Sequence, residues 1–408
     1  LKNNFIHTKL KVVTLLLNRF TLILVLVQIV FSVINYDWSL IFDERIVGEN
    51  RNLKKKNYVD SVEKPENQFK PNVYYLIFDS YASHTVLKKY YNWDDSKFVN
   101  DLTSRDFIVN KNARSNYCFT GASVTSTLSM RYIHLDKKFA DSYNQANYIA
   151  KFYGENKVID RFKAEGYNII TNLEDHHWPR SQNKSLLTDD FVQLLIHISM
   201  LRIFENEIIT HKLRQEILTQ VDGVIKFNKP QVPTFMIMHF MIPHAPFIFK
   251  SDGSKPRNFE SAFGAFEHNK KYIDQVRYSA DQIIKIVDSI KKKDKDALIM
   301  LLADHGFGGN DDMLYLNRNS LAAKKNDRTK PPSDYLEQRF GVLNAISYPY
   351  NLNIPLNTTS VNLFKYIFNS IFNDNHKYLP NKSYFSLIKE PYYFYDITDD
   401  LDEINNIN

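Results

Sequence analysis

The chain has 408 residues, of which 44% are hydrophobic and 24% are charged. This composition supplies a substantial apolar core and excludes an intrinsically disordered protein, while the length fits one large α/β domain with an appendage. The formal net charge of +6 is small and accompanies no nucleic-acid-binding motif, so we expect no nucleic-acid partner. Cys118 is the only cysteine, which excludes an intramolecular disulfide and a cysteine-rich zinc site.

The segment from Phe20 to Trp38 is apolar and carries no charge before Asp37. Its length and its aromatic end predict an N-terminal transmembrane helix over about residues 20–38 that anchors the protein to a membrane. A buried helix of a soluble protein and a secretory signal are the alternatives, although no clear small-residue cleavage site follows. Three basic residues precede the segment: Lys9, Lys11 and Arg19. This flank favours a cytoplasmic N-terminus, with the main domain outside the cytoplasm.

The sequence divides into four parts. Residues 1–42 contain the predicted anchor, and residues 43–70, with the polar run RNLKKKN, predict a juxtamembrane linker. Regular apolar patterns begin near Pro71, so we expect the main folded domain over residues 71–385 and a C-terminal tail over residues 386–408. The first residue is Leu1 and not methionine, which leaves open a longer parent chain with further membrane helices.

Three short apolar runs in the main domain have the pattern of buried strands. The runs are Val73–Phe78, Thr234–Ile242 and Ala297–Ala303. Between the second and the third, Tyr272–Ile290 has apolar residues at helical spacing, which predicts a strand, helix, strand crossover. Strands that alternate with helices indicate an α/β fold with a mostly parallel central sheet covered by helices on both faces.

Each of these runs is followed by an acid or a histidine. The residues that follow are Asp79 after the first, His244 after the second, and Asp304 with His305 after the third. In parallel sheets ligands bind beyond the carboxyl ends of the strands, so we expect these side chains to converge. Carboxylates and imidazoles are ligands of divalent metals. For any one of them alone, a helix-capping Asp or a structural His is the alternative.

A nucleophile is predicted in the segment NYCFTGASVTSTLSM, where Thr120 comes just before a run that can form a helix. The first turn of such a helix points N–H groups back at Thr120, an arrangement that favours a phosphoryl or sulfuryl group. Coordination to a divalent metal would lower the pKa of the threonine hydroxyl. The alternative is that Thr120 only caps the helix.

The order of these motifs resembles the alkaline phosphatase superfamily, specifically its sulfatase-like branch of membrane-anchored hydrolases and transferases. The motifs are Asp79 at a strand end, Thr120 before a helix, PHAPF with His244, and ADHG with Asp304 and His305. With YIDQVRYSADQIIKIVDSI and RFGVLNAISYP, the resemblance extends from about Pro71 to about Phe385.

The resemblance implies roles for these residues. Asp79, Asp304 and His305 would bind one divalent metal ion, and Thr120 would be the metal-bound nucleophile. His244 would bind substrate or assist the leaving group. We also assign Asn116, four residues before Thr120, to substrate binding. The ligand types fit Mn²⁺, Zn²⁺, Ca²⁺ or Mg²⁺ and do not decide among them.

The sequence also departs from the sulfatase pattern. Cys118 stands in CFTGA, without the proline and arginine of the C/S-x-P-x-R context in which formylglycine forms, so sulfatase chemistry of that kind is disfavoured. Asp79 is followed by Ser80 where many sulfatases carry a second aspartate. A second metal would need further ligands, for which no diagnostic spacing exists among the remaining candidates, His176, His177, His239 and His268.

We therefore expect a membrane-anchored, metal-dependent hydrolase or transferase that acts on phosphate esters through Thr120, similar in mechanism to phosphoglycerol and phosphoethanolamine transferases of the cell envelope. Its substrate would be a phosphate or sulfate ester, lipid- or glycan-linked, and the loop Glu174–Arg180 is a candidate for shaping specificity. The alternatives are a sulfate-ester hydrolase without formylglycine and a catalytically inactive envelope-binding homologue. The sequence leaves the oligomeric state open.

Overall fold

The computed structural model describes residues 14, 18, 19, 70–133, 156–172, 205–256, 268–312, 315, 331–348, 352, 354–387 and 390–407. The chain separates into two units, Leu1–Asn67 and Gln68–Asn408, and only three helical residues of the first unit are described. The predicted transmembrane segment over residues 20–38 and the loop Glu174–Arg180 lie outside the described residues. Within the described part of the chain, no helix combines the length and the apolar character needed to cross a membrane.

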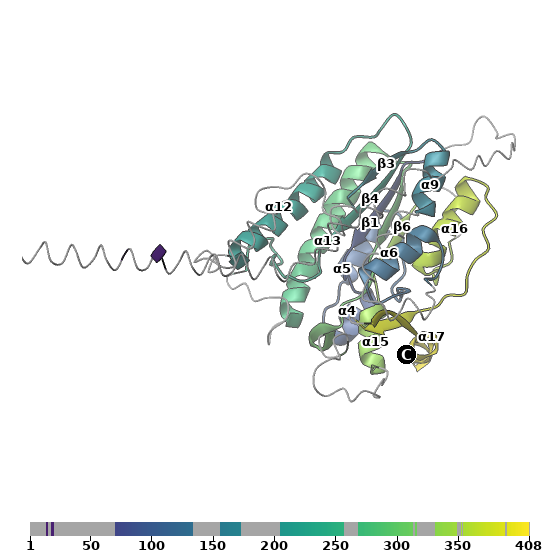
Figure 1. Ribbon diagram of the computed structural model, residues 1–408. Coiled ribbons are helices and arrows are strands. Elements are labelled where there is room, and N and C mark those ends of the chain that lie inside the picture. Colours follow the sequence, from purple (N-terminus) through teal and green to yellow (C-terminus); the bar gives the residue numbers. More distant parts are fainter. Residues whose placement is uncertain are drawn as a thin grey trace, which may run out of the picture. The chain divides into compact units, whose positions relative to one another are not determined.

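The second unit is built on a six-stranded sheet with the strand order β2-β6-β5-β1-β4-β3 (Figure 1). Its strands are β1 (Val73–Phe78), β2 (Phe107–Val109), β3 (Asn168–Thr171), β4 (Thr234–Phe240), β5 (Leu298–Leu302) and β6 (Asn344–Ser347). β1 runs parallel to β4 and β5, and β3 runs parallel to β4. β6 is antiparallel to both β5 and β2. The expected α/β class is confirmed, and the sheet is mixed because of β6.

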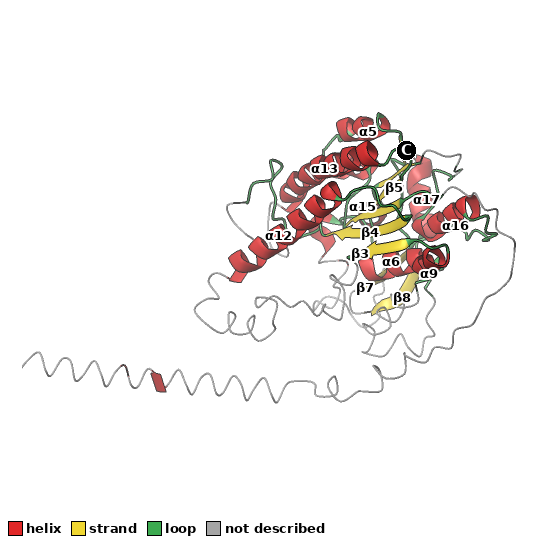
Figure 2. Ribbon diagram, turned by 90° about the horizontal axis from the view of Figure 1, so that it is seen from above, coloured by secondary structure: helices red, strands yellow, loops and turns green. Residues whose placement is uncertain are grey.

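Helices cover both faces of this sheet (Figure 2). They are α4 (His84–Tyr90), α5 (Ser96–Thr103), α6 (Thr120–Ser129), α9 (Lys157–Ala164), α12 (Glu205–Lys226), α13 (His268–Lys293), α15 (Ser333–Phe340), α16 (Ser360–Ile371) and α17 (Thr398–Ile407). A short 3₁₀ turn, η4 (Gly309–Asp311), follows β5, and a separate two-stranded sheet pairs β7 (Tyr384–Leu387) with β8 (Glu390–Asp396).

The alternation of side chains along β1 divides the core into two layers. Tyr74, Leu76 and Phe78 pack with residues of α4, α5, α12 and α13 on one face. The intervening residues, such as Tyr75, pack with α6, α9 and α16 on the other face. Successive side chains of a strand point to opposite faces, so a strand that is buried on both sides must be apolar throughout. Every residue of β1 is buried, which explains its unbroken apolar sequence.

The carboxyl ends of β1, β4 and β5 lie at one edge of the sheet because these neighbours are parallel. The chain leaves β1 through Asp79, whose N–H donates to Phe240 O at 3.0 Å. The next residues are held by α13, because the Tyr272 hydroxyl donates to Ser80 O at 2.8 Å and accepts from Ala82 N at 3.0 Å. The helix expected over Tyr272–Ile290 lies within α13 and begins at this anchoring tyrosine.

Phe162 of α9 tests how strongly the aromatic layer stabilises the fold. Its ring is fully buried, with its centroid 4.1 Å from that of Phe235 and 5.2 Å from that of Phe368. We expect Phe162→Ala to lower the free energy of unfolding by about 3–5 kcal/mol, measured by urea denaturation, because it removes these contacts and leaves a cavity. Ile108→Ala, at an apolar side chain that is 46% exposed, is the control and should cost less than ~1 kcal/mol. Equal losses for the two variants would contradict this account.

Candidate active site

Two acids and two histidines meet at the carboxyl edge of the sheet. Asp79 Oδ2 lies 3.2 Å from His239 Nε2, and Asp79 Oδ1 lies 3.6 Å from His305 Nε2. The Oδ2 atom of Asp304 is also 3.6 Å from His305 Nε2. All four side chains are buried. The convergence expected for Asp79, Asp304 and His305 is therefore present in the structure.

Ser80 connects the ends of β1 and β5. Its backbone has a φ of 62°, in the left-handed region that a non-glycine residue seldom adopts. In this conformation its N–H donates to Asp304 Oδ1 at 3.3 Å and its hydroxyl donates to Asp79 Oδ1 at 3.2 Å. The same hydroxyl lies 3.1 Å from His305 Nδ1. Ser80 was not among the predicted site residues, since nothing in its sequence context signals a left-handed turn.

Thr120 is the first residue of α6, and its hydroxyl faces His305. Thr120 Oγ1 lies 3.2 Å from His305 Nε2. The N-cap position is occupied by Phe119, which is extended and makes no side-chain capping bond. The alternative in which Thr120 only caps the helix is therefore wrong, and its hydroxyl is available to the site.

The hydrogen bonds of His305 indicate its tautomer. Nδ1 lies 2.9 Å from the carbonyl oxygen of Gly306, so this nitrogen carries the proton and donates it. Nε2 is then left with a lone pair directed toward Thr120, Asp79 and Asp304. Burial lowers the pKa of His305, and the nearby Arg339 lowers it further, which favours the neutral imidazole. A neutral imidazole with a free lone pair is the form that binds a metal.

The charge state of Asp79 follows from its neighbours. Burial by itself raises the pKa of this carboxyl, but the neighbouring histidines, His244 and His239 foremost, lower it by more, so the pKa lies well below its usual range. His239 responds in the opposite direction. Burial lowers its pKa, but the hydrogen bond and the charge of Asp79 raise the pKa above its ordinary value. Asp79 is thus an ionised carboxylate that contacts an imidazole on each side.

His239 belongs to β4 and is held there by Asn172. The Asn172 side chain donates to His239 O at 2.9 Å and accepts from His239 N at 2.7 Å. The sequence offered His239 only as one of several histidines without diagnostic spacing. In the parallel register His239 of β4 lies beside Ile77 of β1. Asp79 follows Ile77 by two residues and points to the same side, so the strand pairing brings His239 to Asp79.

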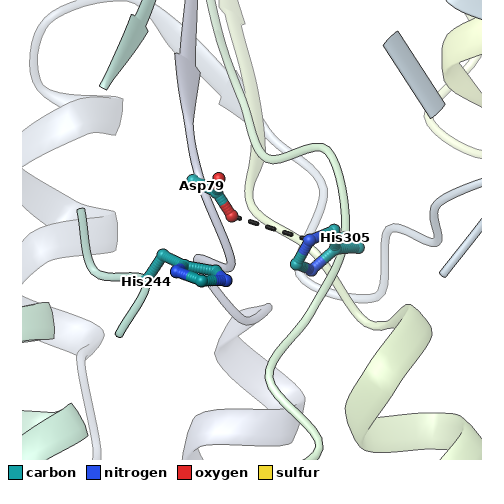
Figure 3. A group of neighbouring side chains, drawn as sticks. All are labelled: Asp79, His244 and His305. Atoms are coloured by element: carbon teal, nitrogen blue, oxygen red, sulfur yellow. Dashed lines mark ion pairs between the residues drawn. The ribbon is translucent and has the colours of Figure 1, made fainter. Parts of the chain in front are cut away.

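His244 approaches the same group from the loop after β4. It is half-buried, and its ring centroid lies 6.1 Å from that of His305. Figure 3 shows the side chains of Asp79, His244 and His305 converging from three loops. Gln275 of α13 fixes this loop, since its amide donates to His244 O at 2.7 Å and accepts from Ile248 N at 2.8 Å. The sequence did not indicate Gln275 as a residue of the site, because the apolar spacing of α13 predicts a helix and says nothing about its polar residues.

The donors at this edge fit a divalent cation. Two sets of three have ligand atoms within 4.8 Å of one another, namely Asp79, His244 and His305, and Asp79, His239 and Asp304. Within the described residues, the buried Oδ2 atom of Asp304 has no hydrogen-bond partner. A buried carboxylate oxygen without a donor is costly, and a cation would satisfy it. The mixture of oxygen and imidazole nitrogen fits Mn²⁺ or Zn²⁺ and does not exclude Mg²⁺ or Ca²⁺.

Other predicted residues lie apart from this group. The Asn116 side chain accepts from Val361 N at 3.0 Å and donates to Lys382 O at 2.7 Å, so in this structure it bonds the protein's own backbone, and its assignment to substrate stays a prediction. Cys118 is fully buried, its thiol donates to Ser386 O, and burial raises its pKa, so it is a packed and unreactive residue. His176 and His177 lie outside the described residues, as does the side chain of His268.

The sequence matches the model of the sulfatase family over residues 71–341, which is more than half of the chain. The chain therefore belongs to the sulfatase family, within the alkaline phosphatase-like enzymes, and is a hydrolase or transferase. No curated protein matches it in a sequence comparison.

Solved structures with a similar fold share little sequence with the chain. The C-terminal periplasmic domain of EcEptC from Escherichia coli is 12% identical, with coverage of 82% of this chain and 94% of that chain and a TM-score of 0.45. The soluble domain of lipooligosaccharide phosphoethanolamine transferase A from Neisseria meningitidis is 13% identical, with coverage of 76% and 90% and a TM-score of 0.45. The putative sulfatase yidJ from Bacteroides fragilis is 13% identical, with coverage of 79% and 83% and a TM-score of 0.43. The family assignment rests on the family match alone.

Asp304→Asn tests the cation site. The amide keeps the shape of the carboxyl and can still accept from Ser80 N, but it has no negative charge for a cation. We expect stoichiometric metal, measured by elemental analysis after dialysis, to be lost while the near-UV circular dichroism stays that of the unmodified protein. The control is Asp294→Asn, which changes another buried carboxyl, bonded to Asn72 and Lys229 just before β5, and should leave the metal content unchanged. Full metal occupancy in Asp304→Asn would contradict the assignment.

Proposed function

We propose that this chain is a metal-dependent hydrolase or transferase that attacks phosphate esters with the hydroxyl of Thr120. The observation that supports it most directly is the 3.2 Å separation of Thr120 Oγ1 from His305 Nε2, beside the carboxyl groups of Asp79 and Asp304. A hydroxyl is a weak nucleophile unless a neighbouring base or a cation activates it. In this protein the hydroxyl lies 3.2 Å from His305, which belongs to a buried group of imidazoles and carboxyl groups that can do so.

Asp79, Asp304, His305 and Thr120 are the residues that would hold one divalent cation. When bound, such a cation lowers the pKa of a coordinated hydroxyl and offsets negative charge on the oxygens of a reacting ester. The residues themselves fix the arrangement. Ser80 holds the two carboxyl groups through its N–H and its hydroxyl, and the Gly306 carbonyl keeps the His305 ring oriented.

In the first half of the reaction, the Thr120 hydroxyl gives up its proton to solvent, and its Oγ forms a bond to phosphorus as the bond from phosphorus to the leaving oxygen breaks. The N–H groups in the first turn of α6 have no partner within the helix, and in this proposal they donate to the phosphoryl oxygens. His244 is half-buried, so it lies where an entering ester can reach it, and its imidazolium can give a proton to the leaving oxygen.

In the second half, the hydroxyl of water or of an acceptor alcohol attacks the same phosphorus. Its oxygen forms the new bond, the bond to Thr120 Oγ breaks, and the proton of the attacking hydroxyl passes to the neutral His244. The Thr120 hydroxyl is regenerated by a proton from the surroundings. Hydrolysis and transfer differ only in which hydroxyl enters.

Phosphate is favoured over sulfate by the residues around the nucleophile. Cys118 is buried and lies outside a formylglycine motif, so the nucleophile is an unmodified threonine. A threonine sulfate must be released by attack at sulfur, whereas an aldehyde hydrate can expel sulfate directly. A phosphothreonine ester can be resolved by an incoming hydroxyl.

A membrane anchor would define where the enzyme works. If residues 20–38 span a membrane with the N-terminus in the cytoplasm, the catalytic domain lies outside the cytoplasm and close to lipid head groups. Tethering raises the local concentration of a lipid- or glycan-linked phosphodiester without any new contact. We therefore propose that the donor substrate is a lipid- or glycan-linked phosphodiester, which favours transfer to an acceptor hydroxyl over hydrolysis.

Thr120→Ala tests the nucleophile. Because Phe119 and not Thr120 occupies the cap, the substitution should change the free energy of unfolding by less than ~1 kcal/mol. Turnover of the probe bis(4-nitrophenyl) phosphate should fall by several orders of magnitude, since no oxygen remains to form the ester. Thr120→Ser keeps the oxygen and should retain measurable turnover. Normal activity in Thr120→Ala would remove the proposed mechanism.

The ester that is cleaved can be identified from the intermediate. Enzyme quenched during turnover of phosphate and sulfate esters is digested, and the peptide that contains Thr120 is weighed by mass spectrometry. We expect a phosphoryl, phosphoglycerol or phosphoethanolamine adduct on Thr120 and none on Thr125, which is buried in the same helix. A sulfate adduct, or sulfatase activity far above phosphoesterase activity, would assign the enzyme to sulfate esters.

A further inference from the structure

Arg339 is a buried cation that none of the roles above includes. It lies near the end of α15 and is only 5% exposed. Its guanidinium donates to backbone oxygens of two separate loops: Nε and Nη2 donate to Cys118 O at 3.0 and 2.6 Å, and Nη1 donates to Gly306 O at 3.1 Å. A guanidinium that donates to the backbone carbonyls of two loops fixes the position of one loop relative to the other.

The two loops are those that carry Thr120 and His305. Cys118 is two residues before Thr120, and Gly306 directly follows His305. The Gly306 carbonyl that accepts from Arg339 is also the one that accepts from His305 Nδ1. The Arg339 guanidinium thus connects the backbone beside Thr120 with the Gly306 carbonyl, which orients the imidazole of His305.

The backbone of α15 reinforces this connection. Gly306 N donates to Arg339 O at 2.8 Å. A Cβ atom on Gly306 would lie 2.2 Å from Gln338 O and 2.7 Å from Gly341 O, so only glycine permits the loop to approach this closely. The glycine of the ADHG motif therefore serves the docking of the His305 loop on α15.

A carboxylate holds the guanidinium in this orientation. Asp312 Oδ2 accepts from Arg339 Nη1 at 3.1 Å, while Asp312 Oδ1 accepts from the Tyr335 hydroxyl at 2.9 Å. The N–H of Gly308 also donates to Asp312 Oδ2 at 3.2 Å. Burial opposes the charge of Arg339, but Asp312 together with the smaller effects of Tyr335, Cys118 and Asp304 outweighs burial and raises the pKa of the guanidinium. Asp312 thus compensates the positive charge of Arg339 and fixes the orientation of its guanidinium.

We propose that Arg339 is a positioning residue that sets the separation of Thr120 from His305 by holding the Cys118 and Gly306 carbonyls on one planar guanidinium. The inference rests on the proposed function, because it assigns Arg339 to the alignment of that nucleophile. Lysine keeps the charge but has a single nitrogen, which cannot reproduce a fork that reaches both carbonyls. The substitution of Arg339 by lysine therefore separates geometry from charge.

The test compares Arg339→Lys with Arg161→Lys. Arg161 of α9 makes a similar fork to Asp374, at 2.8 and 2.7 Å, and its other hydrogen-bond partner, Glu165, is also outside the site. Both substitutions remove side-chain hydrogen bonds and should lower the thermal unfolding temperature. Only Arg339→Lys should lower kcat for bis(4-nitrophenyl) phosphate, by about 10–100-fold with little change in KM, and weaken Mn²⁺ binding measured by titration calorimetry.

The outcomes separate this inference from the proposed function. If Thr120→Ala is inactive but Arg339→Lys matches Arg161→Lys in kcat and in Mn²⁺ affinity, the positioning role is overturned and the nucleophile stands. If Thr120→Ala is fully active, the proposed function fails whatever Arg339→Lys does. Should Arg339→Lys not fold, Asp312→Asn replaces it, because it loosens the same guanidinium. A lower kcat at unchanged KM then supports the role, and kinetics equal to those of Arg161→Lys overturn it.

Discussion

The arrangement of the site depends on one constraint: two carboxyl groups, Asp79 and Asp304, are buried side by side at the edge of a parallel sheet. Neighbouring parallel strands end together, so β1 and β5 deliver these acids to the same place with almost no freedom. Burial of carboxylates is unfavourable unless hydrogen bonds, imidazoles or a cation compensate them. The surrounding residues supply part of that compensation, since Ser80 donates to both acids and His239 Nε2 lies 3.2 Å from Asp79 Oδ2.

Within the described residues this compensation is incomplete, and the carboxylate oxygen that lacks a partner has a chemical consequence. Ser80 satisfies one oxygen of Asp304, but the other is left without a donor, at 3.6 Å from an imidazole nitrogen that has no proton to give. Added hydrogen-bond donors there would stabilise the fold and close the site. Without such donors, a lone pair of Asp304 and the lone pair of His305 Nε2 stay available beside Thr120, an arrangement that suits a cation better than it suits a core.

Sequence reasoning predicted what depends on local pattern and missed what depends on register. The strand over Val73–Phe78 has the same bounds in the structure because an apolar run between Asn72 and Asp79 has unambiguous ends. The apolar stretch predicted to Ile242 continues two residues past the end of β4, since apolar residues also occupy buried loops. Ser80, His239, Gln275 and Arg339 gave no local signal, because each acts on a residue that only the tertiary fold brings near. Asn116 shows the converse: it is near Thr120 in sequence, but its side chain bonds the backbone of Val361 and Lys382, because nearness in sequence does not set the direction of a side chain.

The start of α6 shows how local stability is given up where the site requires it. A serine, aspartate or asparagine at the N-cap would stabilise the helix by ~1 kcal/mol, but its side chain would occupy an N–H group of the first turn. Phe119 stands there instead, with no side-chain capping bond. The N-cap side chain thereby leaves the first-turn N–H groups unoccupied, as the proposed binding of an anionic ester requires, and the hydroxyl of Thr120, one residue later, faces His305. A residue that weakens a helix end at this position is consistent with selection for the site over selection for the helix.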